Sequence, residues 1–264
     1  MTPSRYLAVL ACGVTLAACS KDAVQSITAP ASGASVKFYN FSMSSPGVNF
    51  YANGAQVTAL RSDSGATTKN GTTYSNVAAG ALYTALTSGQ TSLAGRIATL
   101  TDSGVTIATV PTTLVDGKYY SLYLSGPYST TTKTTDAFIV EDPLPAFDYA
   151  KANVRFVNTI YNAPNPMVLW LKSTTVAGDS VAIGGPAGIA YKAASGFVAV
   201  RPDVYNLTVR YPGSNTAVIT RADVTIGTVA FGSPRVYTIS SRGDITITST
   251  TAANRPFLDN TANR

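Results

Sequence analysis

The sequence predicts an all-β protein in which two tandem antiparallel β-sandwiches, immunoglobulin-like in the broad sense, follow one another along the chain. Three observations predict this class: a low charge, short alternating runs separated by turn signals, and a pattern that occurs twice. Charged residues are 12% of the chain and hydrophobic residues 45%, and Thr, Ser and Tyr are abundant, which suits strands rather than disorder. After the first 18 residues, no stretch has the period and caps of a helix.

The first 19 residues predict where the protein is located. Arg5 is followed by an apolar run over residues 6–18. A membrane-spanning helix needs about 20 apolar residues, so this run fits the core of a signal peptide instead. The Leu-Ala-Ala-Cys sequence at residues 16–19 resembles the lipobox of bacterial lipoproteins, in which the cysteine receives a diacylglyceryl group before cleavage. The alternative is an ordinary secretory signal that is cut after Ala18.

The resemblance implies that Cys19 is the lipid attachment site and the first residue of the mature chain. Two or three acyl chains such as palmitate, at about 0.8 kcal/mol per buried CH₂, would hold the protein on a membrane essentially permanently. Ser20 stands where an aspartate would resemble an inner-membrane retention signal. We therefore expect a cell-envelope location, with the outer membrane favoured over the inner.

Alternating apolar residues mark the first strand after a polar tether. Val36 and Phe38 fall on one face and Lys37 on the other. Asn53-Gly54 is the strongest hairpin signal, and further β-type runs continue to Glu141. The scattered Lys and Arg residues, with a net charge of +6, are interpreted as solvated strand faces. They form no basic run, so no nucleic-acid partner is expected.

The same pattern then recurs. The sequence ASVKFYN at residues 34–40 matches ANVRFVN at residues 152–158, VTI at 105–107 matches VTI at 224–226, and Tyr120 matches Tyr237. Three matches in order at nearly constant spacing indicate a tandem duplication. In the less clear middle part, we pair Tyr74 with Phe197. The resulting organisation is a signal peptide (1–18), a flexible tether (19–33), a first sandwich (34–142), a linker (143–151), a second sandwich (152–250) and a tail (251–264).

These motifs also carry a family resemblance. The Val-Lys/Arg-Phe-x-Asn opening, the Tyr-x-x-Val-x-x-Gly motif at residues 74–80 followed by Tyr83, and the Gly-Lys-Tyr-Tyr strand at residues 117–120 resemble the bacterial domain of unknown function 4397. The resemblance implies an exported, often lipid-anchored β-sandwich that is often present in tandem, and it implies no shared activity. The second stretch departs from the pattern, because Asp203 stands where glycine is usual.

The residue types present exclude several chemistries. The chain has no histidine, and both cysteines lie within the first 19 residues. Ser-His-Asp and Cys-His arrangements, disulfides and thiolate metal sites are therefore excluded from the folded part. The single glutamate, Glu141, lies at the linker, and the aspartates stand singly beside turn residues. The Gly-Asp-Ser-Val sequence at 178–181 resembles an esterase nucleophile block, but Ser180 has no histidine to activate it. We predict no catalytic residue, metal or cofactor.

Four residues remain as candidate ligand contacts. Asn40 and Asn158 occupy the same place in both stretches, directly before a turn, and they either cap that turn or mark equivalent ligand sites. Tyr119 and Tyr123 share one face of a strand and either line the core or form a binding surface. Trp170 lies in the apolar run 167–171 and is interpreted as core.

The predicted function is that of a non-catalytic, lipid-anchored cell-envelope protein that acts as a binding or scaffolding module for a protein or polysaccharide ligand. The alternative is a hydrolase of envelope polymers that uses Asp or Ser-Lys chemistry. An enzyme would gather several Asp, Ser or Lys side chains in one pocket, whereas a binding module would expose an aromatic or apolar patch.

Overall fold

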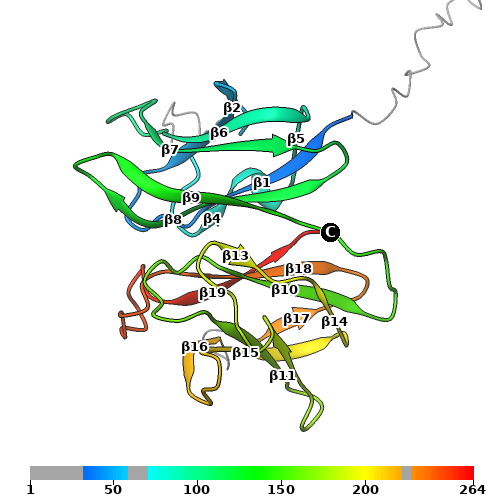
Figure 1. Cartoon of the computed structure of the whole chain (residues 1–264). Helices are drawn as coiled ribbons and strands as arrows, with labels where there is room; N and C mark the ends of the chain where they lie inside the picture. The colour runs from blue at the N-terminus through cyan, green and yellow to red at the C-terminus, as the bar shows by residue number, and fades with distance from the viewer. Residues whose placement is uncertain (1–31, 59–70, 222–226) are drawn as a thin grey trace, which may run out of the picture. The chain divides into compact units, whose positions relative to one another are not determined.

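The computed structural model describes residues 32–58, 71–221 and 227–264. The predicted signal peptide, Cys19 and most of the tether lie outside these residues, as does the repeat match at 224–226. The described chain forms two β-sandwiches (Figure 1), and its only described helical segment is the short 3₁₀ turn η3 (Ala78–Ala81). The all-β prediction is therefore confirmed.

The first sandwich consists of two sheets around one apolar core. Its inner sheet has the order β4 (Asn76–Val77), β1 (Ala34–Asn40), β8 (Tyr119–Ser129) and β9 (Thr134–Glu141), with β5 (Thr84–Leu86) also paired to β1. Its outer sheet has the order β3 (Ala55–Gln56), β2 (Val48–Ala52), β6 (Gly89–Ile97) and β7 (Thr106–Leu114). The predicted core residues Val36 and Phe38 are almost fully buried between these sheets, with Phe38 stacked on Phe50.

The second sandwich has the same arrangement. Its inner sheet has the order β13 (Ala193–Ala194), β10 (Ala152–Asn158), β18 (Val236–Arg242) and β19 (Phe257–Ala262), with β14 (Val198–Val200) paired to β10. Its outer sheet has the order β12 (Ser180–Ile183), β11 (Val168–Ser173), β15 (Asp203–Arg210) and β16 (Ala217–Arg221), with β17 (Val229–Phe231) paired to β15. Val154 and Phe156 belong to its core.

One strand pair in each sandwich is parallel. β1 runs parallel to β8, and β10 runs parallel to β18, whereas the other paired strands are antiparallel. Parallel strands are joined by a long crossover rather than by a tight turn. The order of the strands within each sheet could therefore not be deduced from local turn signals.

The register corrects the matching of the middle parts. Val36 pairs with Thr84 and Val154 pairs with Val198, so Phe197 occupies the place of Tyr83. The predicted pairing of Phe197 with Tyr74 is therefore wrong. The connection from Val36 to Thr84 is four residues longer than that from Val154 to Val198 (48 against 44), and the weak Tyr-x-x-Val motif did not reveal where the extra residues lie.

The two inner sheets pack against each other, so both faces of β1, β8, β10 and β18 are buried. Tyr39, Phe41, Tyr123 and Phe138 of the first sandwich form one apolar cluster with Val157 of the second. In the sequence, the face of β1 opposite Val36 and Phe38 looked like a solvated face. The structure shows instead that it is a second interior.

Lys37 and Arg155 are the clearest correction. Both were interpreted as solvated, yet their exposed fractions are 1% and 0%. Lys37 Nζ donates a hydrogen bond to the carbonyl oxygen of Ala262 at 2.7 Å, and Arg155 Nη1 donates to that of Glu141 at 2.9 Å. Each sandwich thus directs a cation from its first strand to the end of the last strand of the other sandwich.

The C-terminal residues are also part of the fold. Residues 251–264 were expected to form a tail, but β19 pairs with β18 from Arg242–Phe257 to Tyr237–Ala262. It holds the place that β9 holds in the first sandwich. The polar sequence Asp-Asn-Thr-Ala hid this strand, because its burial depends on the sheet and on the other sandwich.

Candidate ligand-binding face

Asn40 and Asn158 occupy equivalent buried positions at the ends of β1 and β10. Asn40 Nδ2 donates to the carbonyl oxygen of Thr72 at 2.8 Å, and its Oδ1 accepts from the backbone N–H of Ser42 at 3.2 Å. Asn158 Nδ2 donates to Ile189 at 3.0 Å, and its Oδ1 accepts from the backbone N–H of Ile160 at 3.0 Å. These bonds tie each strand end to the following turn and to a distant loop, which favours the capping interpretation.

Replacing Asn158 by alanine should therefore lower the free energy of unfolding by about 1–3 kcal/mol. The variant leaves the N–H of Ile160 and the hydroxyl of Ser241 without their buried acceptor, and the carbonyl of Ile189 keeps only the bond from the N–H of Met167. Urea unfolding followed by tryptophan fluorescence measures the change, with Asn165→Ala on the exposed turn as the control. An unfolding midpoint equal to that of the parent would contradict the capping role.

The two candidate tyrosines have different environments, although they share a strand face. Tyr123 is fully buried, with its ring stacked 4.3 Å from that of Tyr39 and 5.1 Å from that of Phe138. Tyr119, at the start of β8, is 38% exposed and lies edge-on to Tyr83 at 5.1 Å. A ligand in solvent can therefore reach Tyr119 but not Tyr123.

A buried polar cluster, here called the junction, lies between the two inner sheets. Asp142 is at its centre and accepts hydrogen bonds from Ser121 Oγ at 2.7 Å, from Tyr83 Oη at 2.6 Å and from Arg155 Nη2. Burial lowers the pKa of Lys37 to about 8, while Asp142 opposes this shift. Lys37 donates to a backbone carbonyl rather than to a serine hydroxyl. The junction is closed to solvent and holds the sandwiches together.

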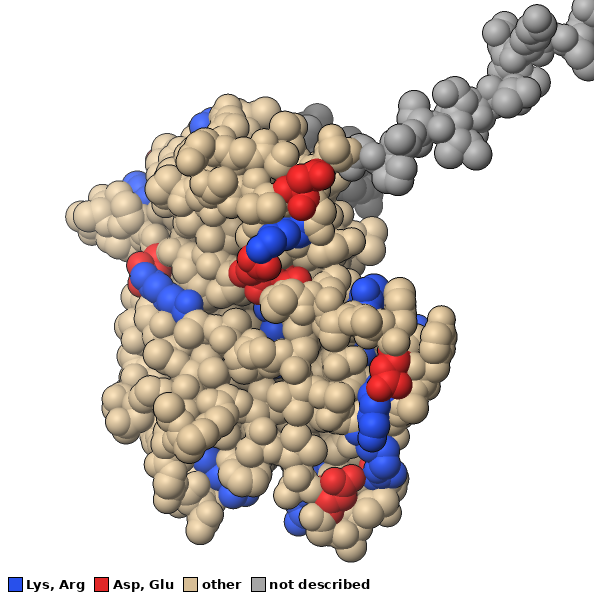
Figure 2. All heavy atoms as spheres, turned by 45° about the vertical axis from the view of Figure 1, so that its right-hand side comes forward, with Lys and Arg blue, Asp and Glu red and all other residues tan. Residues whose placement is uncertain are grey.

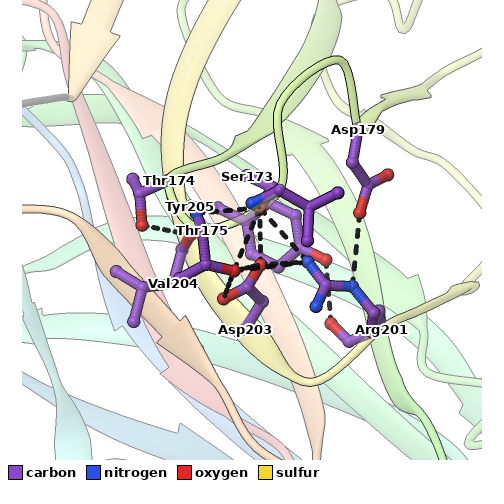
Figure 3. Close-up of polar contacts among 9 residues, drawn as sticks. Ser173, Thr174, Thr175, Asp179, Arg201, Asp203, Val204 and Tyr205 are labelled. Atoms are coloured by element: carbon purple, nitrogen blue, oxygen red, sulfur yellow. Dashed lines mark hydrogen bonds and ion pairs between the residues drawn. The ribbon is translucent and has the colours of Figure 1, made fainter.

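A second polar cluster joins the ends of β11 and β15 (Figure 3). Asp203 accepts hydrogen bonds from Ser173 Oγ at 2.6 Å and from Thr175 Oγ1, and it forms an ion pair with Arg201, which also contacts Asp179 at 3.4 Å. Hydrogen bonds from Ser173 and Thr175, together with Arg201, lower the pKa of Asp203 to about 2. A carboxylate of that pKa is a poor base for a serine hydroxyl at neutral pH. The cluster fixes the strand ends, consistent with Asp179 lying in a turn.

The outward side of β11 and β15 carries a group of side chains that we call the Trp170 face: Trp170, Lys172, Ser180, Asn206, Thr208 and Arg210. Along β15, the inward residues Tyr205, Leu207 and Val209 are fully buried and the residues between them point outward. The register pairs Trp170 with Thr208 and Lys172 with Asn206. Trp170 is partly exposed, with the Arg210 guanidinium 5.2 Å from its ring centroid. The interpretation of Trp170 as a core residue is therefore wrong.

Trp170 separates two surface hollows. One, of about 380 Å³, is lined on its polar side by Lys172, Ser180, Asn206 and Arg210. The other, of about 420 Å³, lies among the turns that follow β12 and β15, and its wall includes Pro186 and Tyr211. An aromatic ring between two such hollows, with polar groups at their margins, is the arrangement expected of a small binding site.

Two polar atoms of this face are buried without a hydrogen-bond partner in the described part of the chain. They are Oδ1 of Asn206 and Nε of Arg210. A buried polar atom without a partner costs about 1–3 kcal/mol, so such atoms usually bond to water or to a ligand. The hydrogen-bonding capacity of Asn206 and Arg210 is thus not fully satisfied by other residues that the structure describes.

The alternation within residues 168–172 contained a signal for this site. Trp170 and Lys172 are two residues apart, so they share the side of the strand opposite Leu169 and Leu171. The partner strand, with Asn206, Thr208 and Arg210 alternating with apolar residues, shows the same pattern. The missing step was the pairing of these two strands, which local sequence does not specify.

The ranges that the structure describes contain neither a metal-binding cluster nor a membrane-spanning helix. Those ranges hold no group of three or more His, Cys, Asp or Glu side chains placed to bind a metal ion. They also contain no helix that is long and apolar enough to cross a membrane. On the face shown in Figure 2, charged side chains are sparse and mostly lie next to a side chain of opposite charge.

The fold and the Trp170 face define a class, an all-β protein of two sandwiches with an aromatic face on one outer sheet. More particularly, the chain belongs to the family described as Domain of unknown function (DUF4397), whose profile matches residues 34–168. The matched range covers the first sandwich and β10 and ends at the first residue of β11. The Trp170 face therefore lies beyond it.

The similarity of this chain to two solved structures is distant. A candidate cell adhesion protein from Bacteroides ovatus ATCC 8483 is 10% identical, with 89% of this chain and 99% of that chain covered and a TM-score of 0.28. CBMbc, of family CBM26, from Eubacterium rectale Amy13K in complex with maltoheptaose is 9% identical, with 87% and 97% covered and a TM-score of 0.25. At such scores the likeness carries no functional information. No curated protein sequence matches the chain.

Proposed function

We propose that this protein is a non-catalytic, lipid-anchored module of the cell envelope that binds a polysaccharide on the Trp170 face. The observation that carries the proposal is the partly exposed indole of Trp170 between two hollows on an open sheet face. The flat apolar surface of an indole suits the C–H face of a sugar ring, and the surrounding side chains can bond sugar hydroxyls.

The surroundings of the face favour binding over hydrolysis. Asn206, Thr208 and Lys172 supply donors and acceptors, but no carboxylate lines either hollow. The neighbouring Asp203 has a lowered pKa and is fully engaged by Ser173, Thr175 and Arg201. Glycoside hydrolysis generally requires a pair of carboxyl groups beside the substrate. The Asp203 cluster instead fixes the ends of β11 and β15, and the side chains between them form a surface suited to binding.

The tandem origin and the anchor belong to the same proposal. The equal strand order and the equal register of β1–β8 and β10–β18 support the second sandwich as a second copy of the family domain. The Leu-Ala-Ala-Cys sequence supports lipid on Cys19, and Ser20 supports the outer membrane rather than the inner.

Cys19→Ala is expected to release the protein from membranes into the soluble fraction, because the variant has no thiol to receive lipid. The intact mass of membrane-extracted parent protein should show an acylated Cys19 at the N-terminus. Cys12→Ala serves as the control and should remain membrane-bound. Sedimentation of the Cys19→Ala variant with membranes would contradict the anchor.

Binding is tested with a soluble chain of residues 20–264 by electrophoresis through gels that contain neutral or acidic polysaccharides. We expect at least one polysaccharide to slow the chain. Trp170→Ala should weaken that binding about tenfold or more, equivalent to about 1.4 kcal/mol. Tyr149→Ala, which removes an aromatic ring that is 81% exposed in the linker, should leave it unchanged. No retardation by any polysaccharide would overturn the proposal and move attention to a protein ligand.

A further inference from the structure

We infer that the Trp170 face selects an acidic polysaccharide, one whose sugar units carry an anionic group such as a carboxylate or a sulfate. This inference rests on the proposed function and specifies its ligand class. The cations Lys172 and Arg210, which line a hollow beside Trp170, lead to it.

The charged side chains that line one of the two hollows are all positive. Lys172 and Arg210 both line the hollow of about 380 Å³, and its lining includes no acidic residue. Neither side chain forms an ion pair with any residue that the structure describes, whereas Lys118, Lys133 and Lys192 each pair with a carboxylate at 2.6–2.9 Å. A carboxylate close by in the chain, that of Asp179, pairs with Arg201 instead.

The position of Arg210 suits recognition of a charged sugar. Its guanidinium carbon lies over the Trp170 ring, 5.2 Å from the centroid, so the charge is next to any sugar that binds at the indole. Its Nε is buried and unpartnered within the described residues. A guanidinium presents a planar set of donors that matches the two oxygens of a carboxylate, and a bond between charged partners is about twice as strong as a neutral one.

The remaining groups complete a site for a sugar rather than for a free anion. Ser180 and Thr208 line the same hollow, and their hydroxyls can exchange hydrogen bonds with sugar hydroxyls. The hollow thus combines an aromatic ring, two cations and two hydroxyl groups, which together fit an acidic sugar unit.

The test uses the soluble chain of residues 20–264 and matched ligands: polygalacturonate with its fully methyl-esterified form, and dextran sulfate with dextran. Esterification removes the charge and keeps the sugar backbone. We expect the acidic form of at least one pair to bind ten times more tightly than its neutral form. The difference should shrink as salt increases, because salt screens exposed charges.

Variants assign the preference to the face. Arg210→Gln and the exposed Lys172→Gln should each reduce the acidic preference at least threefold while leaving binding of the neutral forms in place. Arg235→Gln, which removes the same charge from an exposed loop before β18, should not change it. Lys172 is exposed, so its variant tests the inference even where Arg210→Gln disturbs folding, as judged by circular dichroism.

The outcomes are separable. Equal binding of acidic and neutral forms, weakened by Trp170→Ala, would overturn the acidic preference and leave the proposed function standing. A preference that Arg235→Gln reduces as much as Lys172→Gln does would reflect net charge alone and would also overturn the inference. Absence of binding to all four polysaccharides would overturn the proposed function itself.

Discussion

Asp142→Ala is expected to lower the free energy of unfolding by about 3–5 kcal/mol, a large share of the stability of a typical domain. The side chain is fully buried in the junction, where it is the ion-pair partner of the equally buried Arg155. Removing it leaves the Arg155 cation in the interior without a counter-charge, with Lys37 close by, and leaves Tyr83 and Ser121 without their acceptor. Chemical unfolding of the soluble chain measures the loss.

Glu141→Gln is the matched control for this prediction. Glu141 is the preceding residue and pairs with Lys118 at 2.9 Å, but both side chains of this pair are more than 40% exposed. Exposed pairs of this kind contribute about 0–1 kcal/mol. The double variant Asp142→Ala/Arg155→Met should be more stable than Asp142→Ala alone, because it removes the uncompensated charge. Equal stability of Asp142→Ala and Glu141→Gln would contradict the central role of the junction.

Deleting residues 251–264 should abolish folding of the second sandwich. The deletion removes β19, exposes the edge of β18, and takes out Leu258, whose exposed fraction is 0%. Loss of one buried leucine side chain alone costs about 2–5 kcal/mol. The deletion also removes the carbonyl of Ala262 that accepts from Lys37 and the Asn263 side chain that bonds Tyr83 and Thr238.

Circular dichroism and a thermal melt measure the effect of the deletion. The shortened chain should lose the cooperative transition of the second sandwich, and Leu258→Ala should show a smaller loss of stability. A synthetic peptide of residues 251–264 should restore part of the structure by pairing with the free edge of β18. A shortened chain that melts like the parent would show that these residues are dispensable, as a tail would be.

The same contacts bear on the division of the chain into domains. Residues 34–142 and 152–250 were predicted to be separate sandwich domains, and their independent folding stays a prediction. The structure changes how it has to be tested, because the second piece must extend to Arg264 to include β19. Either piece alone would also expose part of the cluster that Tyr39, Tyr123 and Val157 form together.

Local pattern was sufficient to predict β1 and β10 and one of the two faces of each. The alternation at residues 36–40 and 154–158 correctly placed Val36, Phe38, Val154 and Phe156 in the cores, since a single strand determines which residues share a face. It could not show what covers the opposite face. Lys37 and Arg155 look like solvent-facing residues until the other sandwich is in place.

Asp142 and Trp170 both show that local sequence does not determine whether a side chain is buried. Asp142 is more buried than its sequence suggests, and Trp170 is less buried. Asp142 lies in a Glu-Asp-Pro sequence that is typical of a linker, and only the packing of two sheets makes it a buried counter-charge. Trp170 lies in an apolar run that is typical of a core, and only the pairing of β11 with β15 places it on an open face. Residue type predicted the wrong environment in both cases, because long-range pairing decided it.

The parallel pairing of β1 with β8 has a mechanical consequence when the chain is pulled at its N-terminus. β1 is bonded to β8 over residues 35–40 and 119–124. The C-terminus lies at the same end of this pair as the start of β1, since Lys37 donates to the carbonyl oxygen of Ala262. A force between the two termini therefore loads the bonds of β1 one after another from residue 35, whereas a force between the N-terminus and the end of β8 at Ser129 loads them together. We expect a lower rupture force when single molecules are stretched between residue 32 and the C-terminus than when they are stretched between residue 32 and residue 129. Equal rupture forces would argue against this.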